Sequence, residues 1–198
     1  MCNDEIILKN LALSCQDLDD PVHTRCLEAL CHLTRFPGNN DILAQSPETL
    51  EALVRCGMSH TSDDRMWTLR AMQNITAHAS KRGYFANHDL LQLLCLSAEK
   101  VDFVDEHEAA ISIIGNLCTD PSSVVQIINS ENVVRVLVVV ANNIEYSPEI
   151  QFVACDALAT IAMWMQRVAR AGTVPEGFSF EQLPTLKSTG YLRYNTNE

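Results

Sequence analysis

Four segments of the chain carry the same apolar pattern at a nearly constant spacing. They read TRCLEALCHLT (24–34), MWTLRAMQNIT (66–76), EAAISIIGNLC (108–118) and FVACDALATIA (152–162). Their central apolar residues follow one another at intervals of 42, 42 and 44 positions, and these residues are Leu30, Met72, Ile114 and Leu158. A period of this length is typical of chains whose structural units bury their apolar faces only against neighbouring units.

Each segment has the periodicity of an α-helix. When successive residues advance by 100°, the apolar residues of a segment gather within about 60° of its centre. The four stripes are Cys26, Leu27, Leu30, Leu33 and Thr34; Thr68, Leu69, Met72, Ile75 and Thr76; Ala110, Ile111, Ile114, Leu117 and Cys118; and Ala154, Cys155, Leu158, Ile161 and Ala162. The sequence therefore predicts four long helices that bury one stripe in a shared register.

The stretches between the long helices also match one another. Each begins with a break in the pattern, continues with a short helix-like piece and ends with a second apolar helix. The breaks are 35–41, 77–83 and 119–123, the short pieces 42–45, 84–87 and 124–129, and the second helices 47–57, 88–99 and 130–143. Ser46, Asn87 and Ser130 are expected N-caps, and Gly57 is an expected helix end. The stretch VVRVLVVV has strong β-propensity, but its place in the period predicts a helix.

We therefore expect an all-α chain whose repeat domain covers residues 1–172. Residues 4–17 match the second helix of a unit whose first helix is missing, which predicts a partial unit at 1–20. The later boundaries are units at about 21–62, 63–104 and 105–146, and a last long helix at 147–172. After it the pattern stops, and the aromatic-rich tail 173–198 is expected to cap the last unit, with a place in the groove of its own chain or disorder as the alternatives.

The ends of two long helices resemble those of armadillo repeats. The matching stretches are AMQNITA (71–77) and IIGNLCT (113–119). The period and the three-helix unit are similar to that family as well, and the resemblance covers roughly residues 4–171. It implies a right-handed α-α superhelix, or solenoid, of about three to four repeats. HEAT-type repeats are the alternative, but an Asn at this place favours armadillo.

In the armadillo family, the long third helix lines a concave groove, where an Asn side chain hydrogen-bonds the backbone of an extended peptide. Asn74 and Asn116 match that position, whereas His32 and Thr160 occupy it in the first and last units and depart from the pattern. The residues alone agree on the orientation, because Asn116 lies about 200° from Ile114, opposite the buried stripe. A primary amide offers two donors and an acceptor for main-chain groups. The alternative is that both Asn residues are ordinary polar residues on a solvated face.

Neighbouring positions are expected to supply specificity. One turn before the positions just named stand Glu28, Arg70, Ser112 and Asp156. Armadillo proteins that bind basic localisation signals usually carry Trp there, so the resemblance does not extend to a nuclear-import receptor. Trp67 and Trp164 fall on the non-core face instead, where a Trp ring either anchors a partner or packs between adjacent units. Trp67, Arg70 and Asn74 form one compact candidate hot spot.

The charge of the chain narrows the class of partner. The sequence has 14 Lys and Arg residues against 25 Asp and Glu residues, which gives a net charge of −11. A nucleic-acid binder needs a basic surface to displace counterions, so we expect a protein or an extended peptide segment as partner and no nucleic acid. The longest hydrophobic run, 133–141, contains Arg135 and is too short to cross a bilayer. No membrane partner is expected.

The eight cysteines indicate the compartment. Five of them lie inside helical apolar patterns, and no C-x-x-C pair occurs. Buried free thiols in a reducing compartment fit this pattern better than disulfides or a zinc site. The first ten residues, MCNDEIILKN, carry acids where a secretory leader would be basic. We expect the cytoplasm, with the nucleus as the second candidate.

Two groups of histidines lack the pattern that catalysis or metal binding requires. These groups are His23 and His32 with Cys26, and His78 with His88 and His107. The thiol of the first group is expected to face the core, where it is inert, and the second group lacks metal-ligand spacing. The paired acids Asp19–Asp20 and Asp63–Asp64 precede long helices, where they are expected to favour the N-terminal dipole without an acid–base role. No enzyme, metal or cofactor is predicted.

The sequence thus favours a non-catalytic protein-interaction module, which binds an extended partner segment along a groove through a ladder of Asn side chains. A second hypothesis is an assembly or scaffold subunit, or a fragment of a longer armadillo protein, that packs through the ends of its solenoid. An enzyme is a third option without positive evidence. The chain is expected to be a monomer or a subunit of an assembly.

Overall fold

The computed structural model describes residues 5–59, 61–78, 80, 82–100 and 102–171. Within these ranges the chain forms ten α-helices and one 3-10 helix, and no strand. They are α1 (Glu5–Ser14), α2 (His23–Leu33), α3 (Pro37–Ala44), α4 (Pro47–Gly57), α5 (Ser62–His78), η1 (Arg82–Phe85), α6 (His88–Ala98), α7 (Val104–Cys118), α8 (Pro121–Asn129), α9 (Glu131–Asn142) and α10 (Pro148–Ala171). The prediction of an all-α chain is confirmed. The tail 173–198, predicted to cap or to be disordered, lies outside the described residues.

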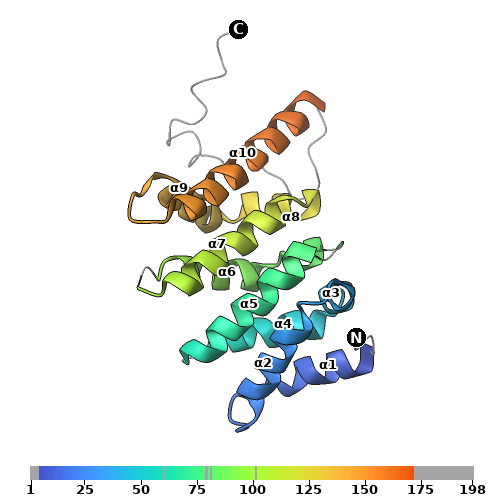
Figure 1. Ribbon diagram of the computed structural model, residues 1–198. Helices are drawn as coiled ribbons and strands as arrows, with labels where there is room; N and C mark the ends of the chain where they lie inside the picture. Colours follow the sequence, from blue (N-terminus) through green and yellow to red (C-terminus); the bar gives the residue numbers. More distant parts are fainter. Residues whose placement is uncertain (1–4, 60, 79, 81, 101, 172–198) are drawn as a thin grey trace.

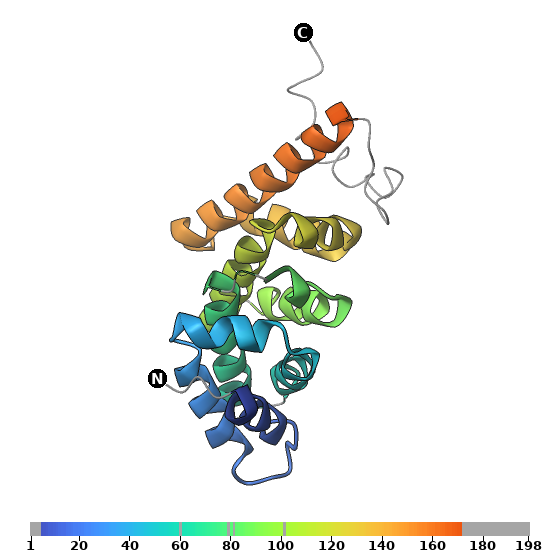
Figure 2. The ribbon, with the colours of Figure 1, turned by 90° about the vertical axis from the view of Figure 1, so that its right-hand side faces the viewer.

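The helices follow one another along the long axis of the molecule, from α1 near one end to α10 near the other (Figure 1). The long helices of the repeated pattern form one layer, in which α5 packs between α2 and α7, and α10 packs on α7. Helices α1, α4, α6 and α9 lie beside them, and each packs against the next. Figure 2 shows α4, α6 and α9 on one side of the long helices. Residues 42 positions apart therefore lie on neighbouring helices.

The shared stripe forms the core of the three earlier long helices. Leu30 on α2, Met72 on α5 and Ile114 on α7 are all fully buried, and so are most residues one turn away from them. These side chains and those of the second layer form one continuous apolar cluster. Because no single helix could bury its stripe alone, the contacts between successive long helices stabilise the fold.

On α10 the predicted stripe is only partly correct. Leu158 and Ile161 are buried, but Cys155 and Ala162 are exposed. On α7 the residue in the same register as Cys155 is Ile111, which is fully buried. The reason is that α10 packs on α7, while no element in the described part of the chain packs on the other side of α10.

Two of the predicted breaks are the beginnings of helices. Helix α3 begins at Pro37 and α8 begins at Pro121, so 35–41 and 119–123 are only partly irregular. A proline at the first helical position costs nothing, because its missing N–H would have no partner within the helix there. The short piece predicted at 84–87 overlaps the 3-10 helix η1, which begins two residues earlier, at Arg82, and ends at Phe85.

The helix ends follow the predicted caps in two cases out of three. The hydroxyl of Ser46 accepts a hydrogen bond from the backbone N–H of Thr49, and Oδ1 of Asn87 accepts one from the N–H of Leu90. Ser130 makes no such side-chain cap, although α9 begins directly after it. The stretch VVRVLVVV lies inside α9, as its place in the period predicts.

Helix α4 ends at Gly57, as predicted, but space is the reason for a glycine there. A Cβ on Gly57 would lie 2.5 Å from Cδ2 of Leu93 on α6. This is the place where α4 and α6 approach each other closely. The glycine therefore brings the C-terminal end of α4 against α6.

Candidate functional site

The nine residues predicted for a partner site all lie on the long helices, and none of them is fully buried. They are Glu28 and His32 on α2; Trp67, Arg70 and Asn74 on α5; Ser112 and Asn116 on α7; and Asp156 and Thr160 on α10. We call the side of α2, α5, α7 and α10 that carries these residues the long-helix face. The period of the sequence places all nine on one layer of the molecule.

Asn74 and Asn116 each join two long helices. Nδ2 of Asn74 donates a hydrogen bond to Oγ1 of Thr34, at the end of α2, over 3.0 Å. Nδ2 of Asn116 donates to Oγ1 of Thr76, on α5, over 3.2 Å. Both hydroxyls are fully buried, and each donates in turn to a carbonyl of its own helix, over 2.6 Å and 2.9 Å. We call these contacts the Asn–Thr bridges.

The bridges use only one N–H of each amide. Within the described ranges, Oδ1 and the second N–H of Asn74 and Asn116 have no hydrogen-bond partner, and both residues are half-buried. Each bridge limits the rotation of the amide, so the remaining donor and acceptor are held at a fixed place. The Asn residues thus have a structural role that the sequence did not predict, and they keep groups that can bind.

Trp67, Arg70 and His32 form a cluster across α2 and α5. The guanidinium carbon of Arg70 lies 5.7 Å from the centroid of the Trp67 ring. The centroid of the His32 ring is 5.8 Å from that of Trp67, and Nε2 of His32 is 3.9 Å from Oε1 of Glu28. One part of the Trp67 ring packs against the core, and the rest stays exposed. A cation over a Trp face is held by the ring quadrupole, which orients Arg70.

A pocket of about 190 Å³ lies between α5 and α7. Arg70 and Ser112 line it, together with Gln73, Glu108 and Ile150. Arg70 and Ser112 each stand four residues, or about one turn, before the Asn of an Asn–Thr bridge. The structure therefore brings Arg70 and Ser112, two of the predicted residues, to one hollow, which Asn74 and Asn116 do not line.

The residues of α10 do not join this arrangement. Asp156 is exposed and Thr160 is half-buried, and in the described part of the chain neither lines the pocket nor hydrogen-bonds to Asn116. Cys118 takes the place of Thr34 and Thr76 on α7, so the side-chain oxygen that anchors an Asn is missing there. Trp164 is half-buried and packs partly against the core. The array of bridges ends at α7.

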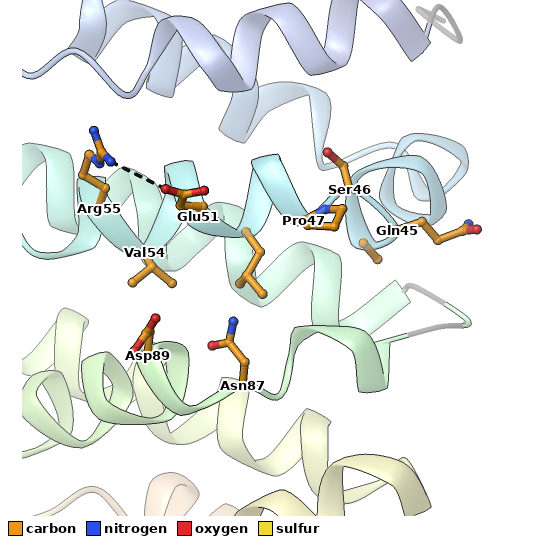
Figure 3. Close-up of a pocket in the computed structure, with 10 residues that line it drawn as sticks. Gln45, Ser46, Pro47, Glu51, Val54, Arg55, Asn87 and Asp89 are labelled. Carbon is orange, nitrogen blue, oxygen red and sulfur yellow. Dashed lines mark ion pairs between the residues drawn. The ribbon is translucent and has the colours of Figure 1, made fainter.

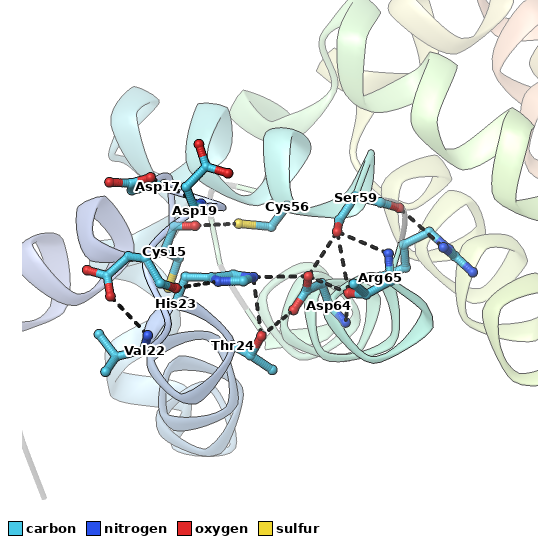
Figure 4. Close-up of polar contacts among 12 residues, drawn as sticks. Cys15, Asp17, Asp19, Val22, His23, Thr24, Cys56, Ser59, Asp64 and Arg65 are labelled. Carbon is cyan, nitrogen blue, oxygen red and sulfur yellow. Dashed lines mark hydrogen bonds and ion pairs between the residues drawn. The ribbon is translucent and has the colours of Figure 1, made fainter.

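A second set of contacts joins the same helices at their N-terminal ends. Nε2 of His23, on α2, lies 3.0 Å from Oδ2 of Asp64, on α5. The carboxylate of Asp64 also accepts hydrogen bonds from the hydroxyls of Thr24, Ser59 and Thr61. Figure 4 shows His23, Thr24 and Ser59 around this carboxylate. Asp64 is fully buried, and four donors compensate for its burial.

These contacts shift the pKa values of Asp64 and His23. Burial alone would raise the pKa of Asp64, but the hydrogen bonds that it accepts outweigh burial and lower its pKa to about 2. The hydrogen bond to Asp64 raises the pKa of His23, and a hydrogen bond to the carbonyl of Asp20 raises it further. Both ring nitrogens of His23 therefore face acceptors, which favours the charged imidazolium.

The next contact of this kind joins Arg65 of α5 to Glu106 of α7. Nε of Arg65 lies 2.9 Å from Oε2 of Glu106, and Nη2 lies 2.8 Å from Oε1. The two side chains are 9% and 1% exposed. Nη1 of Arg65 donates to the carbonyl of Ser59, and the guanidinium lies 5.4 Å from the ring of Phe103. This bidentate geometry satisfies a buried charge pair. We call the His23–Asp64 and Arg65–Glu106 contacts the ionic bridges.

The ionic bridges follow the same period as the Asn–Thr bridges. Arg65 comes 42 residues after His23, and Glu106 comes 42 residues after Asp64. The signal was present in the sequence, but it becomes visible only when residues one period apart are known to be neighbours. Asp64 lies in the first turn of α5, where an acid favours the helix dipole, and its buried carboxylate also joins α5 to α2.

Most of the thiols are buried, as predicted. Burial raises the pKa of Cys56 and Cys95 to about 11 and that of Cys118 to about 12, so these thiols stay protonated at neutral pH. Cys155 is exposed and departs from the prediction. Cys26 is half-buried. The ring nitrogens of His23 contact the carbonyl of Asp20 and the carboxylate of Asp64, and not the Cys26 thiol.

Helix α10 meets the criteria for a membrane span by length and composition alone. Its segment Pro148–Arg170 has a mean hydropathy of 1.2 in the most apolar window, and 33% of that window is buried. Core helices of soluble proteins meet the same criteria. Among the residues that the structure describes, no group of three His, Cys, Asp or Glu side chains is placed to hold a metal ion.

Comparison of the sequence with protein-family models and with curated proteins gives no match. Among solved structures, the crystal structure of an engineered protein, a target of the Northeast Structural Genomics Consortium, is similar to this chain. The TM-score is 0.65 at 18% sequence identity, over 84% of this chain and 68% of the other. At this identity the likeness concerns the helical fold and carries no function.

Proposed function

We propose that the chain is an armadillo-type solenoid that acts as a non-catalytic protein-interaction module. Its period of about 42 residues and the side-by-side packing of its long helices support this class of fold. The partner is an extended segment of another protein, which lies across the long-helix face. The observation that carries the proposal is the pair of amides, Asn74 and Asn116, held in the same way on adjacent helices by Thr34 and Thr76.

The two amides bind main-chain groups of the partner. Each can donate its second N–H to a carbonyl and accept a backbone N–H at Oδ1. Packed helices are about 8–10 Å apart, and three residues of extended chain span about 10 Å. Asn74 and Asn116 therefore match main-chain groups about three residues apart. Because the bridges fix both amides before binding, little side-chain entropy is lost on association.

The residues around the amides select side chains. Trp67, with Arg70 and His32 beside it, offers an amphipathic ring to an apolar or aromatic side chain of the partner. The pocket between α5 and α7 receives a small polar side chain between Arg70 and Ser112. Glu28, Asp156 and Thr160 border this surface on α2 and α10.

Composition supports the remaining parts of the proposal. A net charge of −11 favours a protein partner over nucleic acid, and free buried thiols favour the reducing cytoplasm or the nucleus over an oxidising compartment. We place no membrane, metal or cofactor in the mechanism. The interaction needs no bond to be made or broken in the partner.

Selection from a library of random dodecapeptides displayed on phage tests the proposal. An enriched peptide is synthesised with a fluorophore, and its Kd is measured by fluorescence polarisation. The peptide is then N-methylated at one main-chain position at a time. We expect two positions about three residues apart at which methylation weakens binding about tenfold, because each removes a main-chain hydrogen bond and adds bulk. Unchanged affinity at every position would exclude main-chain recognition.

A second candidate function is assembly through the two ends of the array. On α1, Ile6 is 69% exposed, and on α10, Phe152 is 71% and Met163 is 52% exposed. Exposed apolar residues of this size often mark an interface. Light scattering of the purified chain over a range of concentrations separates the two candidates. A monomer at all concentrations favours the peptide-binding function, and a defined oligomer that Phe152→Glu disrupts favours assembly.

A further inference from the structure

A larger pocket lies away from the long-helix face, between α4 and α6. Its volume is about 780 Å³, and residues from the end of α3, from α4 and from the beginning of α6 line it. The two helices meet at Gly57 and Leu93, and the pocket lies between α4 and the beginning of α6 (Figure 3). Clefts of about 300–1,000 Å³ are typical of ligand sites. We call this pocket the α4–α6 wedge.

One wall of the wedge is apolar. Leu50 and Val54 of α4 line it, and Figure 3 shows Val54 pointing toward α6. Leu50 is only 6% exposed, whereas Val54 is half-buried. Ala44, at the end of α3, extends the apolar surface. This wall can cover several methylene groups of a ligand.

The opposite wall is polar and carries an unpaired negative charge. Asn87, the N-cap of α6, and Asp89 in its first turn point toward α4 (Figure 3). Asp89 is exposed, and its carboxylate makes no ion pair in the part of the chain that the structure describes. The cation nearest in the lining, Arg55, points away from α6 and lies 3.6 Å from its own partner, Glu51. Among the residues that the structure describes, the carboxylate of Asp89 thus has no cation paired with it.

Asn87 adds a hydrogen-bond donor to this wall. Its Oδ1 caps α6 by accepting from the N–H of Leu90 over 2.8 Å. The cap fixes the amide, so that Nδ2 points into the wedge toward α4 (Figure 3). Within the described ranges Nδ2 has no protein acceptor. A carbonyl of a ligand can accept from it.

We propose that the α4–α6 wedge is a second binding site, which takes a lysine or arginine side chain from an exposed segment of a partner protein. These side chains have an apolar stem and a cationic end. The stem lies against Leu50 and Val54, the cation pairs with Asp89, and a main-chain carbonyl of the same segment accepts from Asn87. A glutamate would meet Asp89 with like charge, and a purely aliphatic side chain would leave that carboxylate without a partner.

This site is independent of the proposed binding at the long-helix face. None of the residues that line the wedge lies on α2, α5, α7 or α10. A partner could therefore occupy both surfaces, or the wedge could bind a different protein. A result that contradicts binding at one of the two sites therefore does not contradict binding at the other.

NMR titration of the ¹⁵N-labelled full chain tests the proposal. The probe is the peptide acetyl-Gly-Gly-Lys-Gly-Gly-amide, with norleucine and glutamate peptides of the same length for comparison. We expect the lysine peptide to shift the backbone amides of Leu50, Val54 and Asp89 and the side-chain amide of Asn87. The norleucine peptide keeps most of the stem and lacks the charge, and it should bind at least threefold more weakly.

Asp89→Asn is the decisive variant, and Asp63→Asn is its matched control. Both aspartates are exposed and take the second position of their helices, α6 and α5. Asp89→Asn should weaken binding of the lysine peptide about threefold to fivefold, while Asp63→Asn leaves it unchanged. Equal binding by the lysine and norleucine peptides, equal effects of the two variants, or shifts only at the side-chain amides of Asn74 and Asn116 would each overturn the proposal.

Discussion

The side-chain amide of Asn116 donates a hydrogen bond to the hydroxyl of Thr76, which lies 40 residues earlier in the chain, over 3.2 Å. The hydroxyl is fully buried and donates in turn to the carbonyl of Met72. Asn74 and Thr34 repeat the same contact one period earlier. The residues that are proposed to hold a partner thus also hold the long helices to one another, and their two roles have to be measured separately.

The structural role of the Asn–Thr bridge predicts a loss of stability for one substitution on α5 and no loss for another. Thr76→Val removes a buried hydroxyl that makes hydrogen bonds to both helices, and it should lower the free energy of unfolding by about 1–2 kcal/mol. Thr68→Val should instead raise it or leave it unchanged, because Oγ1 of Thr68 is buried without a hydrogen-bond partner in the described part of the chain. Urea unfolding of both variants provides the measurement. Equal losses would contradict the assigned role of Thr76.

The ionic bridge between α5 and α7 predicts a larger effect. Glu106→Gln leaves the buried guanidinium of Arg65 without its counter-charge, and it should cost about 3 kcal/mol or more of stability. Glu99→Gln is the control, because Glu99 pairs with Arg135 in a contact where both side chains are half exposed. That surface pair should contribute less than about 1 kcal/mol. Similar changes in the two unfolding midpoints would show that the Arg65–Glu106 pair adds little.

The ionic bridge between α2 and α5 predicts how stability depends on pH. The pKa of Asp64 falls from 3.8 to about 2 on folding, so its contribution is fully present above about pH 4 and is lost as the pH falls toward 2. The pKa of His23 rises above 6.5 on folding, so its contribution is present below pH 6.5 and is lost as the pH rises through the folded value. This pair therefore stabilises the fold most between about pH 4 and 6.5.

Comparison of His23→Gln with the wild type isolates the upper limb of this dependence. The difference in unfolding free energy should be largest near pH 5 and should shrink toward pH 9. His88→Gln, at an exposed histidine at the start of α6, is the control and should give a small difference at every pH. A difference for His23→Gln that stays constant from pH 5 to 9 would exclude the charged pair.

The period of the apolar stripe was enough to predict the all-α fold and the position of every long helix. Periodicity works here because residues in the same register, such as Met72 and Ile114, are buried alike on successive long helices. It failed at Cys155, since burial there depends on an element packed beyond α10 and not on the helix itself. It also missed the N-terminal turns of α3 and α8, where a proline begins the helix instead of interrupting it.

The contacts between helices were harder to predict. The 100° advance per residue predicts that Asn74 and Asn116 lie opposite the buried stripe. Their hydrogen bonds to Thr34 and Thr76 depend instead on how far one helix is shifted along the next. The same shift pairs Arg65 with Glu106 and not with another acid nearby. The α4–α6 wedge was also missed, because the sequence does not show that residues of α4 and of the beginning of α6 line one hollow.

Binding of one selected, fluorophore-labelled peptide to two double variants tests the proposed function most directly. Asn74→Ala/Asn116→Ala removes the bridges and the amides, whereas Thr34→Val/Thr76→Val removes the bridges and keeps the amides. Both variants are measured by fluorescence polarisation at a temperature where circular dichroism shows them folded. We predict that the asparagine variant raises the Kd at least tenfold and that the threonine variant raises it less than threefold. Equal Kd values for the asparagine variant and the wild type, or equal losses in both variants, would contradict a ladder of amides that holds the main chain of a partner.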